Sequence, residues 1–133
     1  SEKNLSEKIF IFEYLSDQEI IYLYKNCFAV IIPSYVGTVT FPVIEGFFFK
    51  KPVISATDSL DNLYKNELFS INLKDHKSLK NTIIDMKANP EKIKSLVLNA
   101  HELFNKVYND HNSVNQLEEI INEYNLYQKT WKN

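Results

Sequence analysis

The sequence predicts an α/β fold, a Rossmann-like parallel sheet with flanking helices. Short apolar runs alternate with segments whose apolar residues recur at helical spacing, which is the order of successive βα units. One run, "FAVIIP" at 28–33, is hydrophobic throughout and therefore suits a strand covered on both faces. We expect a single domain over 1–133. Its alternating part is 1–72, and its helical tail is 73–133.

Four strands are expected. "KIFIFEYL" at 8–15 is rich in β-favouring apolar residues and ends at Ser16, which indicates a buried strand of about five residues. The run at 28–33 is the second strand. "KPVIS" at 51–55 and "LFSI" at 68–71 are the third and fourth.

The predicted helices have recognisable start signals. Ser16 and Glu19 have capping-box spacing, so they indicate a helix over 17–25. Pro42 has no N–H to lose in a first turn, so it fits the beginning of a helix that continues over 43–49. Further helical patterns begin at Asp75, at Pro90 and at Ser113. The last one has an apolar stripe and extends to about residue 130.

Composition excludes several classes of protein. The hydrophobic share of 44% excludes a disordered chain, and no apolar run reaches the roughly 20 residues of a membrane span. All 15 basic residues are lysines and the net charge is −2, so nucleic acid is not an expected partner. No signal peptide is visible, which predicts a cytoplasmic protein. The only methionine is Met86, so we expect a piece of a longer protein.

Several chemically suggestive residues have simpler interpretations. Cys27 is expected to be a buried small apolar residue. Asp58 and Asp61 could form a carboxylate pair, but "ATDSLDN" fits a turn with capping acids better. No metal site is expected, because the histidines lack ligand spacing and should be exposed. They are His76, His101 and His111.

The aromatic cluster "GFFFKK" at 46–51 has two interpretations. Phe47 and Phe48 can be buried between a helix and the sheet, which we favour because phenylalanine prefers protein interiors. Alternatively, the cluster touches a membrane, with Lys50 and Lys51 meeting anionic headgroups.

The loop over 34–41 is the first candidate for a binding site. In an open parallel sheet, ligands bind beyond the carboxyl ends of the strands, where loops run into helix N-termini. Gly37 allows a positive φ or close approach to a ligand. Free N–H groups at Thr40 and Phe41 would face outward with the positive end of the helix dipole. This arrangement suits a phosphate or a pyrophosphate.

Glu45 follows one turn into the predicted helix. Its carboxylate could accept hydrogen bonds from the hydroxyl groups of a ribose or a hexose. It could equally be an acid that only stabilises the helix dipole. Gly46 beside it would let the helix pack closely on the sheet, although glycine costs about 1 kcal/mol against alanine in a helix.

A longer stretch carries a family resemblance. "FEYLSDQEIIYLYKNCFAVIIPSYVGTVTFPVIEGFFFKKPVIS" resembles the carboxyl-terminal domain of retaining GT-B glycosyltransferases of the GT4 type, the glycosyl transferases group 1. The matching features are the "S-D-x-E" helix start, the strand ending in "P-S", and "F-P-V-I-E-G" followed by "K-P-V-I-S". The later helical segment is similar to the family's in order and phasing.

The resemblance implies roles for individual residues. Glu45 matches the second glutamate of the family's E-x7-E motif, which holds the nucleotide ribose. The first glutamate of that motif is replaced by Gly37, as in a minority form of the loop, and Lys50 replaces a turn glycine. The other implied donor-binding residues are Thr38, Val39, Thr40 and Phe41 around the sugar and diphosphate, and Glu13 and Tyr14 beside the base.

The function implied by the resemblance is glycosyl transfer. A nucleotide diphosphate sugar would donate a hexose to a saccharide or lipid-linked acceptor held by an amino-terminal lobe that this chain lacks. The reaction would be retaining and metal-independent, with no cofactor and no assignable catalytic side chain. We expect this chain alone to be inactive, because transfer needs donor, acceptor and leaving-group stabilisation together.

Other readings remain open from the sequence. The chain could be a non-catalytic interaction module derived from a glycosyltransferase. Strand edges exposed by the missing lobe would favour self-association, and a membrane-peripheral position is compatible with the aromatic cluster. A generic flavodoxin-like or receiver-like fold is weaker, because the strand ends lack an acidic cluster.

Overall fold

A computed structural model describes residues 8–34, 41–56, 64, 66–108 and 121. Three parallel strands form a sheet in the order β1-β2-β3, which confirms the predicted parallel α/β architecture. The strands are β1 (Val30–Ile32), β2 (Val53–Ala56) and β3 (Phe69–Ile71). Each lies within a predicted strand or overlaps most of one.

The described residues form four helices besides the sheet. They are α1 (Asp17–Asn26), α2 (Phe41–Phe48), α3 (Ser78–Ala88) and α4 (Pro90–Val107). The predicted capping box at α1 is present, with the Ser16 amide donating to Glu19 Oε2 at 2.8 Å. Helix α3 begins later than predicted, because Asp75 lies in a turn and its Oδ1 accepts from the Lys77 amide at 2.9 Å. The last predicted helix, from Ser113, falls outside the described residues apart from Ile121.

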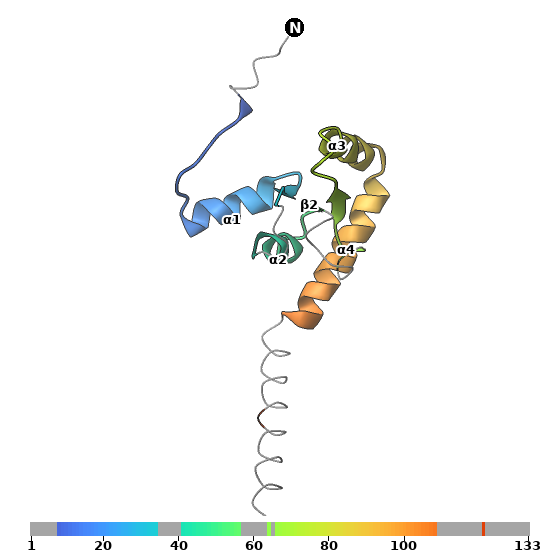
Figure 1. The fold of residues 1–133 in the computed structure, drawn as a ribbon. Helices are drawn as coiled ribbons and strands as arrows, with labels where there is room; N and C mark the ends of the chain where they lie inside the picture. Colours follow the sequence, from blue (N-terminus) through green and yellow to red (C-terminus); the bar gives the residue numbers. More distant parts are fainter. Residues whose placement is uncertain (1–7, 35–40, 57–63, 65, 109–120, 122–133) are drawn as a thin grey trace, which may run out of the picture.

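Each face of the sheet has its own core, and β2 is buried along its whole length (Figure 1). The strand β1 is covered less completely than the sequence predicted, since Ile31 is 41% exposed. Helix α2 and the second half of α4 cover one face; α3 and the first half of α4 cover the other. The buried residues of the first core are Val43, Phe47, Val53, Leu68 and Ala100. Those of the second core are Ile54, Phe69, Ile71 and Met86. Successive β2 residues therefore serve opposite cores, as strand geometry requires.

The strand predicted within 8–15 is absent from the structure, so that prediction was wrong. It runs as an extended trace away from the sheet (Figure 1), and Phe10 and Ile11 are 76% and 88% exposed. A strand needs a neighbour to receive its backbone hydrogen bonds. Among the described residues, the sheet contains only β1, β2 and β3, so this segment has no strand to pair with.

The prediction that Phe47 and Phe48 are both buried was wrong for Phe48. Phe47 is buried, with 1% of its surface exposed, whereas Phe48 is 52% exposed. Neighbouring positions on a helix point about 100° apart, so only one of these two rings can face the sheet. The Phe48 ring instead packs edge-on against Phe49, at 4.8 Å between centroids.

The expectations for Cys27, for the histidines and for a membrane span can also be compared with the structure. Cys27 is half-buried rather than fully buried, since it lies at the exposed C-terminal end of α1, and its Sγ donates to the Tyr24 carbonyl oxygen at 3.4 Å. His76 is exposed, but His101 is half-buried, since its Nδ1 lies 3.2 Å from the Phe47 carbonyl oxygen. His111, Asp58 and Asp61 lie outside the described residues. Within the described part of the chain, no helix is long and apolar enough to cross a membrane.

Gly46 brings α2 close to the sheet, as predicted. A Cβ atom at this position would lie 2.5 Å from Val53 Cγ2 and 3.6 Å from Val30 Cγ2. Val53 is buried and β-branched, so it has little freedom to move away. Only glycine lets the helix lie at this distance from β1 and β2.

Helix α2 ends in a Schellman motif. The Lys51 amide donates to the Gly46 carbonyl at 2.8 Å, and the Lys50 amide donates to the Phe47 carbonyl at 3.2 Å. Lys50 has φ 55°, the left-handed conformation in which glycine is usual. A glycine would adopt this conformation without strain, whereas a lysine here carries strain.

Gly46→Ala should destabilise the fold. The clash with Val53 costs about 1–3 kcal/mol, which outweighs the roughly 1 kcal/mol that alanine gains in helix propensity. Urea unfolding of the two single variants and of the double variant Gly46→Ala/Val53→Ala measures their coupling. The loss caused by Gly46→Ala should shrink or reverse in the Val53→Ala background. An equal loss in both backgrounds would show that this contact does not set the helix position.

Lys50→Gly should stabilise the fold by about 0.5–1 kcal/mol, because relief of the left-handed strain exceeds the added entropy of the unfolded chain. Lys50→Ala is the matched control, since it removes the charge and keeps the strain. Urea unfolding should rank Lys50→Gly above both the control and the wild type. Equal stability of the two variants would contradict this account.

Candidate functional site

The candidate site lies where the carboxyl end of β1 leads to the N-terminus of α2. Val43 in the first turn of α2 packs in the same core as Ile32 at the end of β1. Farther along, Gly46 lies beside the starts of β1 and β2. The N-terminus of α2 therefore faces the carboxyl ends of the strands, where open parallel sheets bind ligands.

The structure describes only one of the loop residues predicted to bind the donor. Gly37, Thr38, Val39 and Thr40 lie outside the described residues. Phe41 is the first residue of α2 and is 80% exposed. It therefore lies at the helix N-terminus, where the first amides have no partner within the helix. Its part in an anion site stays a prediction.

Glu45 is half-buried on α2 and has a defined partner on α1. The Tyr24 hydroxyl donates a hydrogen bond to Glu45 Oε2 at 2.6 Å. The Tyr24 ring also stacks on Phe49, with centroids 5.2 Å apart and planes at 10°. The ring contact orients the hydroxyl, and the hydroxyl orients the carboxylate. Among the described residues, Glu45 Oε1 has no hydrogen bond and is available to a ligand.

The pKa of the Tyr24 hydroxyl is raised well above its ordinary value. Partial burial is the main cause, and the hydrogen bond to Glu45 and the charge of its carboxylate add to it. Each of these effects disfavours a phenolate beside a carboxylate. Tyr24 therefore keeps its proton at neutral pH and acts as the donor of this pair.

Tyr24 is a candidate site residue that the sequence did not reveal. It follows the apolar spacing of α1, and no pattern in the sequence would pair it with Glu45, which lies 21 residues later. Only the packing of α1 on α2 brings the two side chains together. A polar-tipped aromatic residue on an otherwise apolar helix face was the one available signal.

Glu13 and Tyr14 are not brought to Glu45 by any contact within the described residues. Both lie in the extended segment before α1, where Glu13 is exposed and Tyr14 is 85% exposed. Within the same part of the chain, no group of three or more His, Cys, Asp or Glu residues is arranged to hold a metal ion.

A solved structure supports the fold. The chain is similar to sucrose-phosphate synthase from Thermosynechococcus elongatus, with a TM-score of 0.77 and 17% sequence identity. The match covers 93% of this chain and 32% of the other, so this chain spans about a third of that protein's length. A comparison with curated proteins finds no match.

A match to a family model shows which protein family the chain belongs to. The model described as glycosyl transferases group 1 matches residues 1–103, well over half of the 133 residues. The matched range contains the capped α1, the whole parallel sheet, and α2 with Glu45. On this evidence, the chain belongs to the glycosyl transferases group 1 family.

Proposed function

We propose that this chain is the donor-binding part of a glycosyltransferase. It binds a nucleotide diphosphate sugar from which a hexose passes to a saccharide or lipid-linked acceptor. Family membership supports glycosyl transfer as the activity. The observation that carries donor binding is the Tyr24–Glu45 pair, a positioned carboxylate one turn from the N-terminus of α2.

The diphosphate is assigned to the N-terminus of α2. Pro42 has no N–H, so the amides of Phe41, Val43 and Ile44 are the first-turn donors. These donors and the helix dipole stabilise the negative charge of a diphosphate, including the charge that grows on it as a leaving group. The loop from Gly37 to Thr40 is expected to add further backbone donors. This source of positive potential is why we propose metal-independent transfer without a cofactor. The retaining course of the reaction is proposed from the family resemblance alone.

The nucleotide ribose is assigned to Glu45. An ionised carboxylate accepts hydrogen bonds from neighbouring hydroxyl groups, and Oε1 remains available while Tyr24 holds Oε2. A hydrogen bond to a charged group contributes about 1.5–3 kcal/mol, more than a neutral one. The side chain of Glu45 is fixed before the ligand arrives, so less conformational entropy is lost on binding. The predicted position of Glu13 and Tyr14 beside the base stays a prediction.

The acceptor requires more protein than this chain contains. The chain spans 32% of the sucrose-phosphate synthase chain that it resembles in fold. Transfer needs donor and acceptor held together in one geometry. We therefore propose that a further lobe supplies the acceptor site and that this chain alone binds donor without turnover.

A second candidate function is a non-catalytic interaction module. The exposed apolar segment 8–15 favours it, because a soluble protein rarely exposes several neighbouring large apolar side chains. The exposed residues are Ile9, Phe10, Ile11, Phe12 and Tyr14. A segment of this kind can pair with a strand of another copy of the chain, which would give self-association.

Glu45→Gln should weaken nucleotide binding at least about tenfold, because it removes the charge and retains an acceptor for Tyr24. Isothermal titration with UDP, GDP and their sugar conjugates measures the affinity, which we expect in the high-micromolar range for one nucleotide. Tyr24→Phe should weaken binding less, because it only frees the carboxylate to rotate. Glu102→Gln, an exposed glutamate on α4, is the matched control and should bind as the wild type does. Wild-type affinity in Glu45→Gln would refute the ribose assignment.

The wild-type chain should self-associate in a concentration-dependent way in sedimentation velocity runs. Ile11→Asp should reduce this association, because it places a charge in the middle of the exposed apolar segment. Ile84→Asp is the matched control, an exposed isoleucine on α3 away from the segment. A wild-type chain that stays monomeric at high micromolar concentration would count against the interaction module.

A further inference from the structure

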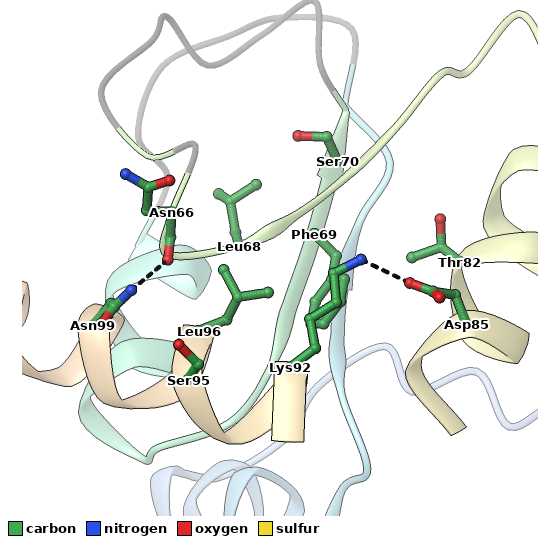
Figure 2. A pocket seen from close by; sticks show the side chains of 10 residues that line it. All are labelled: Asn66, Leu68, Phe69, Ser70, Thr82, Asp85, Lys92, Ser95, Leu96 and Asn99. Atoms are coloured by element: carbon green, nitrogen blue, oxygen red, sulfur yellow. Dashed lines mark hydrogen bonds and ion pairs between the residues drawn. The ribbon is translucent and has the colours of Figure 1, made fainter. Parts of the chain in front are cut away.

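A second concave region, which we call the β3 hollow, lies along the outer edge of β3. Its volume is about 550 Å³, and residues of β3, α3 and α4 line it (Figure 2). Its apolar part consists of Leu68, Phe69 and Leu96. Glu45 and Tyr24 do not line it, and the nucleotide site lies on the β1 side of the sheet. The β3 hollow is therefore separate from the proposed donor site.

The polar side chains of the β3 hollow have unused hydrogen-bonding capacity. Within the described residues, the hydroxyl groups of Ser70, Thr82 and Ser95 make no hydrogen bond. The Asn99 amide donates to the Asn66 main-chain carbonyl at 3.2 Å, and its own carbonyl oxygen stays available. Hydroxyl and amide groups both donate and accept. A partner for them must likewise offer donors and acceptors together.

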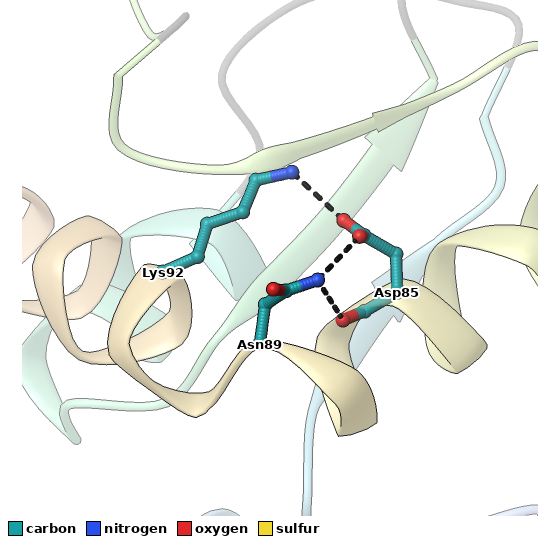
Figure 3. Close-up of polar contacts among 3 residues, drawn as sticks. All are labelled: Asp85, Asn89 and Lys92. Atoms are coloured by element: carbon teal, nitrogen blue, oxygen red, sulfur yellow. Dashed lines mark hydrogen bonds and ion pairs between the residues drawn. The ribbon is translucent and has the colours of Figure 1, made fainter.

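The charges of the β3 hollow cancel. Only two of the residues that line it are charged, and Lys92 Nζ lies 2.8 Å from Asp85 Oδ2 (Figure 3). Asn89 Nδ2 donates to the other carboxylate oxygen, Oδ1, also at 2.8 Å. The Lys92 ammonium lies 5.6 Å from the centre of the Phe69 ring as well. The hydrogen bond from Lys92 lowers the pKa of Asp85, so the Asp85 carboxylate keeps its negative charge at neutral pH.

We propose that the β3 hollow binds a neutral saccharide. Sugar hydroxyl groups donate and accept hydrogen bonds, which matches the free Ser, Thr and Asn groups. The C–H faces of a sugar ring suit the apolar part of the hollow, in which Leu96 is half-buried and Leu68 and Phe69 expose 6% and 5% of their surfaces. The volume lies within the roughly 300–1,000 Å³ of ordinary small-molecule sites.

Two other classes of ligand fit less well. An anion would have to compete with Asp85 for Lys92, because Lys92 is the one cationic side chain among the residues that line the hollow. An apolar ligand would remove water from the hydroxyl and amide groups without replacing its hydrogen bonds. The proposal does not depend on donor binding, since the two sites share no residue. In a glycosyltransferase, such a site would hold saccharide away from the point of transfer.

The test is a titration of the ¹⁵N-labelled 133-residue chain with maltotriose, cellotriose and mannotriose, followed by backbone amide shifts. At least one of them should give saturable shifts at α3, α4 and β3, with a Kd on the order of 1 mM because an open site buries little of its ligand. Ser95→Phe fills the hollow and should weaken binding at least about tenfold. Lys94→Phe adds the same ring at an exposed α4 position that does not line the hollow and should leave binding unchanged.

A charge variant tests the choice of a neutral ligand. Asp85→Asn leaves the Lys92 ammonium unpaired, so it should add binding of the anionic trigalacturonate, which the wild type should not bind. Three results would overturn the proposal. They are no saturable shifts with any of the three neutral saccharides, shifts unchanged by Ser95→Phe, or a wild-type preference for trigalacturonate. Nucleotide titration of the same variants reports separately on the Glu45 site.

Discussion

The close approach of α2 to the sheet at Gly46 is the contact on which the rest of this structure depends. The missing side chain lets Val53 lie where a Cβ would be only 2.5 Å away. That distance places Val43 and Phe47 in the core and sets the direction of the whole helix. The N-terminus of α2 then faces the carboxyl ends of the strands, and Glu45 lies within reach of Tyr24. The packing of α2 and the geometry of the candidate site are thus two results of one contact.

The turn at the end of α2 helps to hold the helix against the sheet, but it strains the backbone at Lys50. β2 starts at Val53, soon after the last helical residue, Phe48, so the chain must turn sharply. The Schellman hydrogen bonds make this turn and satisfy the last carbonyls of the helix. In this turn Lys50 adopts a left-handed backbone conformation, which is strained for lysine and would not be strained for glycine. The turn geometry is maintained because the buried residues on both sides of it hold their positions.

The two candidate sites differ in chemistry because they differ in position. At the N-terminus of α2, unpaired amides and a helix dipole favour a negatively charged group. Along β3, Lys92 and Asp85 neutralise each other, and hydroxyl and amide groups dominate. Helix α4 connects the two regions, since its second half packs with α2 and its first half lines the β3 hollow. A donor with a diphosphate and a neutral saccharide therefore suit different parts of one domain.

The sequence by itself determined the local features, because each depends on residues close together in the chain. The Ser16 and Glu19 capping box, the proline in the first turn of α2 and the unbroken apolar run that contains β1 belong to this group. The close packing at Gly46 was also visible, and the glycosyltransferase resemblance selected Glu45 as a candidate site residue. Lys50 stood out because it occupies a turn position where glycine is usual.

Only the tertiary structure decided features that depend on partners distant in sequence. The segment 8–15 has the composition of a strand, but a strand exists only where another strand receives its hydrogen bonds. Phe47 and Phe48 are chemically identical, and the rotation of α2 on the sheet decided which one is buried. Tyr24 met Glu45, and Lys92 met Asp85 beside Phe69, through helix packing. Such contacts leave no periodic signal in a sequence, because packing between elements has no fixed spacing along the chain.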